Sequence, residues 1–309
     1  MRLRFLVCVL LAAGVPASLL AAPGVPEDQP LNAARVGWVR IGLEAHKLFI
    51  TATTVAEWSV EDTKTVAGRL VESPQGAAIA AGPELLKVSY DADLPGLHSK
   101  TTLWMDPGTG NSLQYEIRES GKRDRERIVR FTDEGAYQRT RRPRPAESAT
   151  DPSSWTDASA GFWPYSERLA GTTVLDSLGL LYFIAGSNLA QTGDQMEVLV
   201  FQKRQLVRVR LTVDGLVDAQ VAYRATGDDG SRSCRGSARA LRIRLTVLPY
   251  GTEKVDFDFL GLKSDIVVYL EPRSRLLLRI EGRAAIVGRV TSTLQNARLK
   301  GGVSCPGLI

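Results

Sequence analysis

The sequence predicts a mainly β protein (a β-rich α+β fold) with a curved antiparallel sheet, or an open half-barrel, wrapped around one central apolar helix. Three observations lead to this prediction. Apolar and polar residues alternate in short runs through most of the chain, as they do in half-buried strands. Between residues 172 and 188, apolar residues recur at helical spacing instead. This helix is apolar on nearly every side, so other parts of the protein must cover it all round.

The predicted helix spans residues 173–186. Thr173 and Asp176 have the spacing of a capping box, and Gly186 supplies a natural end. One stripe of the helix consists of apolar residues, namely Val174, Leu175, Leu178, Leu181, Tyr182 and Ala185. The opposite stripe is apolar as well and consists of Leu180, Phe183 and Ile184. We expect the apolar faces of the sheet to contact Leu175, Leu178, Leu181 and Tyr182.

The expected strands are short and separated by turn residues. Before the helix they lie within 36–60, 85–90, 99–105, 112–118 and 122–131. After it they lie at 195–201, 206–213, 217–226, 238–248, 255–260, 266–270, 276–281 and 286–297. Exposed loops are expected at 73–84 and 136–162. In the later strands one face is apolar and the other charged, so we expect Asp256 and Asp258 to face arginines such as Arg242 and Arg244 across the sheet.

Two turns of similar sequence follow strands in the two halves of the chain. Residues 104–109 (WMDPGT) match residues 269–274 (YLEPRS) in character, and the first turn is strongly hairpin-forming. The two hairpins could belong to related halves, 31–145 and 165–300, joined by an exposed loop at 139–162. The likeness is explained equally well if the same type of turn occurs twice without a common origin.

The first 22 residues are typical of a secretory signal peptide. Arg2 and Arg4 precede an apolar run at 5–13 that is too short to span a membrane. The sequence leaves three cleavage points open, after Ala17, Ala21 or Ala22. We therefore expect a periplasmic protein whose single β-rich domain covers residues 23–309.

The charge and cysteine content limit the partners and the cofactors. Loss of Arg2 and Arg4 lowers the formal net charge from +5 to +3, which argues against a nucleic-acid partner. The same cleavage removes Cys8 and leaves Cys234 and Cys305, which we expect to pair as a structural disulfide in an oxidising compartment. A reactive thiol pair is the alternative, but the sequence has no C-x-x-C motif.

The sequence contains no motif that identifies an enzyme. His46 and His98 stand in unrelated contexts, and we expect no metal site and no cofactor. Asp256 and Asp258 are interpreted as solvated surface residues. The arginines within 139–144 could attract an anionic lipid or polymer, although a solvated loop is the simpler interpretation.

Two segments resemble a family of exported bacterial proteins, domain of unknown function (DUF) 3108. The helix sequence VLDSLGLLYF (174–183) is similar to that family's Asp-x-Leu-Ser-x-hydrophobic-Tyr helix. The closing strands (265–270 and 276–280, then Gly282 and IVGRV at 286–290) resemble the family's ending, and residues 99–145 resemble its first half. The family's arginine after the helix tyrosine is missing, since Ala185 and Gly186 stand near that place. The resemblance implies a β-rich shape similar in outline to the half-barrels of envelope lipoprotein carriers, and no activity.

Two functional hypotheses follow. The first is a non-enzymatic envelope protein that binds a hydrophobic or lipid-like ligand, with seven ligand-binding residues: Leu175, Leu178, Leu180, Tyr182, Phe183, Ile184 and Trp163. The second is a structural or assembly factor of the envelope that acts through contacts with a protein partner, using the segment 139–165.

Overall fold

The computed structural model describes residues 31–47, 50–147, 150–165, 172–248 and 255–308. The predicted signal peptide, residues 1–22, lies outside these ranges. The described chain is mainly β, as the alternation of apolar and polar residues predicted.

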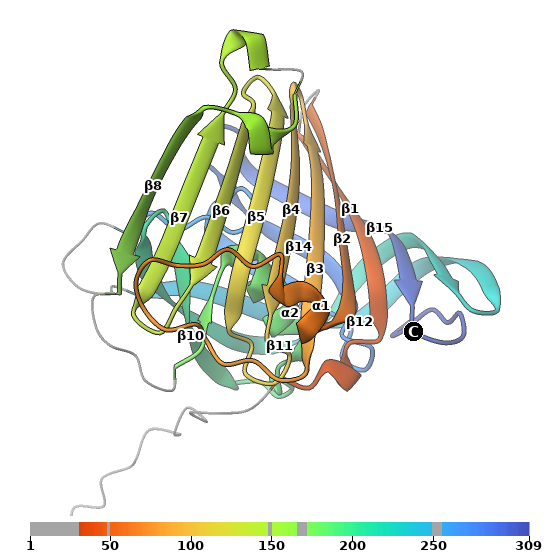
Figure 1. Cartoon of the computed structure of the whole chain (residues 1–309). Helices are drawn as coiled ribbons and strands as arrows, with labels where there is room; N and C mark the ends of the chain where they lie inside the picture. Colours follow the sequence, from red (N-terminus) through yellow and green to blue (C-terminus); the bar gives the residue numbers. More distant parts are fainter. Residues whose placement is uncertain (1–30, 48–49, 148–149, 166–171, 249–254, 309) are drawn as a thin grey trace, which may run out of the picture.

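The first half of the described chain consists of eight antiparallel strands, which form the fan-shaped layer in the foreground of Figure 1. They are β1 (Trp38–Lys47), β2 (Ile50–Asp62), β3 (Glu84–Leu94), β4 (Leu97–Met105), β5 (Ser112–Gly121), β6 (Arg125–Phe131), β7 (Gly135–Arg142) and β8 (Asp157–Pro164). A short helix, α1 (Thr63–Ala67), follows β2. Three 3₁₀ turns, at Ala33–Arg35, Pro145–Glu147 and Pro152–Ser154, complete this half.

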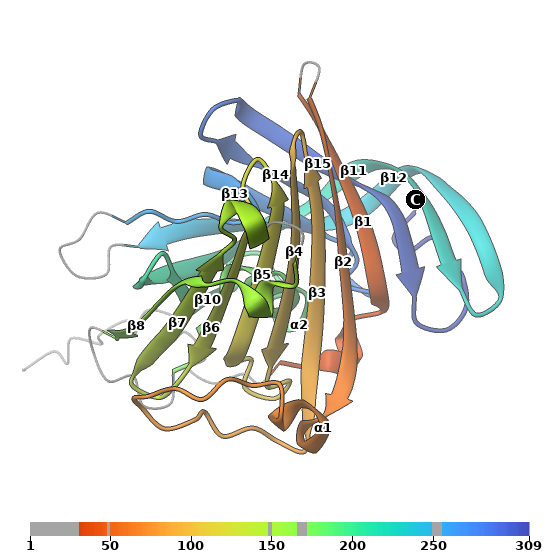
Figure 2. The ribbon, with the colours of Figure 1, turned by 45° about the horizontal axis from the view of Figure 1, so that its top comes forward.

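The second half contains the central helix and seven strands. The helix is α2 (Ser177–Gly186). The strands are β9 (Val174–Leu175), β10 (Gln195–Gln202), β11 (Gln205–Gly227), β12 (Gly230–Leu248), β13 (Leu262–Leu270), β14 (Leu277–Ala284) and β15 (Gly288–Leu299). Figures 1 and 2 show β10–β14 behind the fan of the first half, with the far end of the long β11–β12 hairpin reaching out to one side.

The fifteen strands of the described ranges belong to one sheet, because the first and last of them pair. β1 lies antiparallel to β15, and this pairing joins the two halves. The sheet is mixed and not purely antiparallel, since β9 pairs in parallel with β10 and the end of β15 pairs in parallel with β11. The β15–β11 pairing closes a ring of strands β11–β15, which is not a barrel.

The central helix is buried between the two halves. Every residue from Leu178 to Gly186 is buried, so the prediction that the helix is covered all round is confirmed. It contacts β3 and β4 of the first half and β9 and β10 of the second. Both apolar stripes of α2 belong to the same hydrophobic core as the inner side chains of the sheet, for example Leu103, Val209 and Ile243.

The predicted start of the helix is wrong by four residues. Asp176 is the N-cap residue, and its carboxylate accepts hydrogen bonds from the N–H groups of Leu178 and Gly179. Val174 and Leu175 instead pair with Leu199 and Val200 of β10, so sheet hydrogen bonds take the place of a first helical turn. The helix ends at Gly186, as predicted.

Three further predictions are wrong in detail. The expected loop at 136–162 contains β7 and most of β8, so Arg139, Arg141 and Arg142 lie in a strand. Of the residues that the structure describes in 255–260, only Phe259 makes a β-bridge. Asp256 pairs with Lys203 and Lys263, whereas Arg242 and Arg244 pair with Asp214, which a bulge in β11 places beside them.

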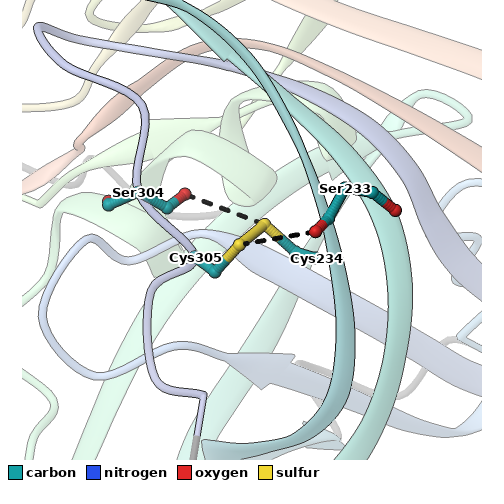
Figure 3. The surroundings of a disulfide bond; sticks show 4 residues. All are labelled: Ser233, Cys234, Ser304 and Cys305. Atoms are coloured by element: carbon teal, nitrogen blue, oxygen red, sulfur yellow. Dashed lines mark hydrogen bonds between the residues drawn. A yellow bond between two sulfur atoms is a disulfide. The ribbon is translucent and has the colours of Figure 1, made fainter.

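The predicted disulfide is confirmed. Cys234 in β12 and Cys305 in the C-terminal tail are bonded, with their Cα atoms 5.5 Å apart. Figure 3 shows the tail running beside the hairpin strand, where the carbonyl of Ser233 also approaches the Cys305 sulfur. The tail is held further by a hydrogen bond from the N–H of Arg239 to the carbonyl of Gly307 and by a bridge between Ala238 and Leu308. It therefore lies fixed along β12 instead of fraying.

Candidate functional site

Six of the seven predicted ligand-binding residues lie together inside the protein. These six are Leu175, Leu178, Leu180, Tyr182, Phe183 and Ile184. At most 5% of any one of them is exposed, and other side chains of the same chain surround them. The Tyr182 ring meets Trp58 of β2 edge to face, with the ring centroids 5.7 Å apart. The stripe that we expected to need a cover is thus covered by the sheet.

Trp163, the seventh predicted residue, belongs to a different cluster. It packs against the cluster that contains Phe131 of β6 and Phe201 of β10, and the guanidinium carbon of Arg204 lies 4.5 Å from the centre of its ring. The predicted site is therefore divided between two clusters of the core.

The N-terminal end of α2 holds a buried carboxylate. Asp176 is fully enclosed, and burial raises its pKa to about 6 although two helix N–H groups bind the carboxylate. Its own N–H donates to the hydroxyl of Ser112 at the start of β5. The helix dipole stabilises a negative charge at this end, which partly offsets the cost of burying it.

The C-terminal end of α2 holds a buried arginine that comes from another element. The guanidinium of Arg275 donates to four carbonyl groups at the end of the helix and just beyond it, those of Ile184, Ala185, Ser187 and Leu189, at 2.8–3.3 Å. Burial lowers the pKa of Arg275 to about 10. The last carbonyls of a helix lack intrahelical donors, and Arg275 supplies them here, while the Ile184 carbonyl also accepts from the Ser187 hydroxyl and the Ser187 carbonyl from Arg35.

The two similar turns of the sequence have the same hydrogen-bond pattern. Asp106 and Glu271 each accept side-chain hydrogen bonds from the N–H groups two and three residues later. Each also accepts, through its carbonyl, from the residue four positions later, which is Gly110 in one turn and Arg275 in the other. Both turns lie against α2. A Cβ at Gly110 in the first turn would lie 3.0 Å from the Phe183 ring, and Arg275 in the second turn donates to the Ala185 carbonyl.

A polar hollow of about 430 Å³ lies on the outer face of β1–β4, away from the helix. The buried residues of β2, Ala56 and Trp58, point to the opposite face. We call this site the β1–β4 hollow, and it is defined by Arg40, Thr53, Val55, Glu57, Ser89, Tyr90, Asp91, Asp93, His98 and Lys100. Charges of both signs line it.

The densest group in the hollow is formed by Asp91, Asp93 and His98. Nδ1 of His98 lies 2.7 Å from Asp93 and Nε2 lies 3.4 Å from Asp91, and Lys100 lies 3.9 Å from the other oxygen of Asp91. One ligand atom from each of the three residues lies within 4.8 Å of the others, which is metal-ligand spacing. In this arrangement, however, each ring nitrogen already faces its own carboxylate, so the polar atoms of the group have partners within it.

Sequence reasoning missed Arg275 and the Asp91–Asp93–His98 group for different reasons. Leu94-Pro95-Gly96-Leu97 is a tight turn that sets Asp93 opposite His98, and that signal was readable. Nothing near Arg275 in the sequence indicates the end of a helix some ninety positions earlier.

Among the described residues, no helix has the length and apolar character needed to cross a bilayer. No family model, curated protein or solved structure matches the chain. The resemblance to the DUF3108 family therefore stays a prediction.

Proposed function

We propose that this protein is a non-enzymatic periplasmic protein of the cell envelope that acts as a structural or assembly factor through contacts with another protein. The observation that carries the proposal is the burial of α2 by the chain's own side chains. The feature that suggested an apolar ligand is thereby accounted for, which leaves the surface as the place of recognition.

The β1–β4 hollow is the contact surface that we assign to this role. Its opposed charges, Arg40 and Lys100 against Glu57, Asp91 and Asp93, can pair with a partner of complementary pattern and reject one of the wrong sign. Its strands are rigid supports, because each pairs with neighbours on both sides.

The open half-barrel belongs to the same proposal. A sheet curved around α2 would enclose the helix and leave its outer, charged face for a partner. Strand curvature measured in an experimental structure tests this: two flat layers in place of a curved wall would contradict it.

The proposed contact can be tested with a photoreactive amino acid placed in the hollow. We expect a probe at Val55, which lines the hollow, to give a discrete cross-linked product with one envelope protein in intact cells. The matched control is the same probe at Val60, which lies on the same strand, is 49% exposed and does not line the hollow. The proposal fails if Val55 gives no product, or if both positions give the same one.

A lipid-like ligand is the second candidate, and one observation favours it. The hydroxyl of Tyr182 is buried and has no hydrogen-bond partner within the described part of the chain. A buried donor without a partner costs stability, and a ligand oxygen could satisfy it. Organic extraction of the purified protein followed by mass spectrometry separates the candidates, since a stoichiometric lipid would favour the ligand and an empty protein would favour the assembly factor.

A further inference from the structure

We infer that the outer face of β12–β15 and the tip of the β14–β15 hairpin together dock onto an anionic phospholipid surface. This inference goes beyond the proposed protein contact, because it concerns the other half of the molecule and a different partner.

The first observation is a row of arginines on one face of adjacent strands. We call it the arginine face, and it consists of Arg242, Arg244, Arg279, Arg283 and Arg289. Directly opposed residues share a face of a sheet. Arg242 lies opposite Tyr269, Tyr269 opposite Arg279, and Arg283 opposite Arg289, so the side chains continue across four strands.

The second observation is that two of the carboxylates on this face lie beneath the arginines. The Asp214 side chain is 16% exposed and pairs with Arg242 and Arg244, which are 36% and 52% exposed. The Glu281 side chain is 17% exposed and pairs with Arg279 and with Arg289, which is 75% exposed. Because each of these acids is shared by two guanidinium groups, N–H donors remain for phosphate oxygens. A third carboxylate, Asp265, is 70% exposed and pairs with Arg283, so the positive excess of the face comes from the other four arginines.

The third observation is an isolated apolar side chain at the end of the same hairpin. Ile286 is 97% exposed, whereas the other exposed large apolar residues in the described ranges reach 49%. It stands in the turn after β14, beside Val287 and between Arg283 and Arg289. Figure 2 shows this hairpin, in dark blue, at the upper left of the molecule.

The combination indicates a membrane surface and not a nucleic acid or an acidic protein patch. Guanidinium groups spread over a sheet face match a planar array of phosphodiesters, which a lipid leaflet presents. A nucleic acid offers no apolar region for Ile286, but the boundary between headgroups and acyl chains does. Basic residues flanking an apolar tip are the arrangement that favours insertion at that boundary.

The experiment is vesicle flotation with the purified full-length mature protein. We expect binding to mixed phosphatidylcholine–phosphatidylglycerol vesicles and much weaker binding to phosphatidylcholine alone. Raising the salt from about 0.1 M to about 1 M shortens the screening length from about 10 Å to about 3 Å and should release the protein.

Two exposed substitutions test the two parts of the surface, each with a matched control. Ile286→Ser should weaken binding about tenfold, because the variant lacks the apolar side chain whose transfer from water into the lipid favours binding. Arg289→Gln should weaken it about fivefold, the loss expected for one basic residue near an anionic surface. The controls are Leu216→Ser, an apolar residue 48% exposed on β11, and Arg224→Gln, an exposed arginine on the same strand, and neither should change binding.

Three results would overturn the inference: no binding to the anionic vesicles, equal binding to neutral vesicles, or binding unchanged in both Ile286→Ser and Arg289→Gln. Circular dichroism of each variant confirms that it is folded. If Ile286 serves a protein contact instead, the wild-type protein will not float with vesicles, which is the first of these results.

Discussion

The turns at residues 106–111 and 271–276 share their hydrogen bonds but support α2 differently. At the fourth position after the acidic residue the backbone has a positive φ in both, +78° at Gly110 and 56° at Arg275. Glycine adopts this conformation easily and lets the first turn approach Leu31 and Phe183 closely. Arginine is strained there, yet its side chain binds four carbonyls of the helix end.

The difference shows that one turn geometry can support a helix in two ways: the turn backbone can pack closely against the helix, or a long side chain from the turn can hydrogen-bond to it. The first turn needs the absence of a side chain, because a Cβ at Gly110 would lie 2.9 Å from Leu31. The second needs a long side chain with several donors. Strain at Arg275 is tolerated because the hydrogen bonds it allows are worth more than the strain costs.

The largest expected effect is that of Arg275→Gly. This change gives the second turn the residue of the first and relieves the backbone, but it removes a buried group that donates to four carbonyls. We expect the free energy of unfolding to fall by roughly 3–5 kcal/mol in urea titrations. Arg273→Ala, an exposed arginine of the same turn, is the control and should change little. An Arg275→Gly protein as stable as the wild type would mean that the arginine does not support the helix.

The disulfide distinguishes the second turn from the first, because the C-terminal tail packs against it. Gly307 lies so close to Glu271 that a Cβ would be 2.9 Å from the Glu271 side chain. Replacing Cys234 and Cys305 together with Ser should lower stability by roughly 4 kcal/mol in the chain-entropy model without preventing folding. Hydrogen exchange should then speed up near Glu271 and not near Asp106, and equal changes at both turns would contradict the link.

The helix ends also differ in how they respond to pH. Burial raises the pKa of Asp176 to about 6 from a usual value of 3.8, so the folded state binds its proton more tightly than the unfolded state. Its contribution is therefore complete below about pH 4 and is lost as the pH rises through 6, a change of roughly 3 kcal/mol. Urea titrations of the wild type and Asp176→Asn between pH 4 and 7.5 measure it. The wild type should lose stability relative to the variant as the pH rises, and a constant difference would refute this.

The smallest expected effect comes from the acidic residues of the turns themselves. Asp106 accepts from the N–H groups of Gly82, Gly108 and Thr109, and these hydrogen bonds hold its pKa below the usual value although burial opposes them. Asp106→Asn weakens these hydrogen bonds and should cost about 1 kcal/mol. Glu271→Gln should cost a similar amount in thermal unfolding if the two turns are equivalent. A cost several times larger at one of them would show that their shared pattern hides different roles.

Local sequence patterns were sufficient to predict several features of the structure. The β content follows from alternating residues, the burial of α2 from its apolar stripes, and the hairpin at 106–111 from its turn residues. Pairing of Cys234 with Cys305 followed from counting cysteines after the predicted cleavage. Strands β7 and β8 were missed because tertiary pairing, and not local sequence preference, forms them. Their arginines, glycine and small residues have weak strand preference, and they are held in the sheet by pairing with β6 and with each other.

The sequence by itself determined which segments are apolar, and therefore that one helix had to be enclosed by strands. Only the tertiary structure decided what encloses it and where its ends are held. Pairing of Val174 and Leu175 with β10 moved the start of the helix to Ser177, and Arg275 reached its end from a turn some ninety residues later. The tertiary structure likewise brought Asp91, Asp93 and His98 into one hollow and aligned arginines from three strands on one face. The physical reason is that periodicity reports which side of an element avoids water, whereas partners across the sheet depend on register and connection, which no short stretch of sequence contains.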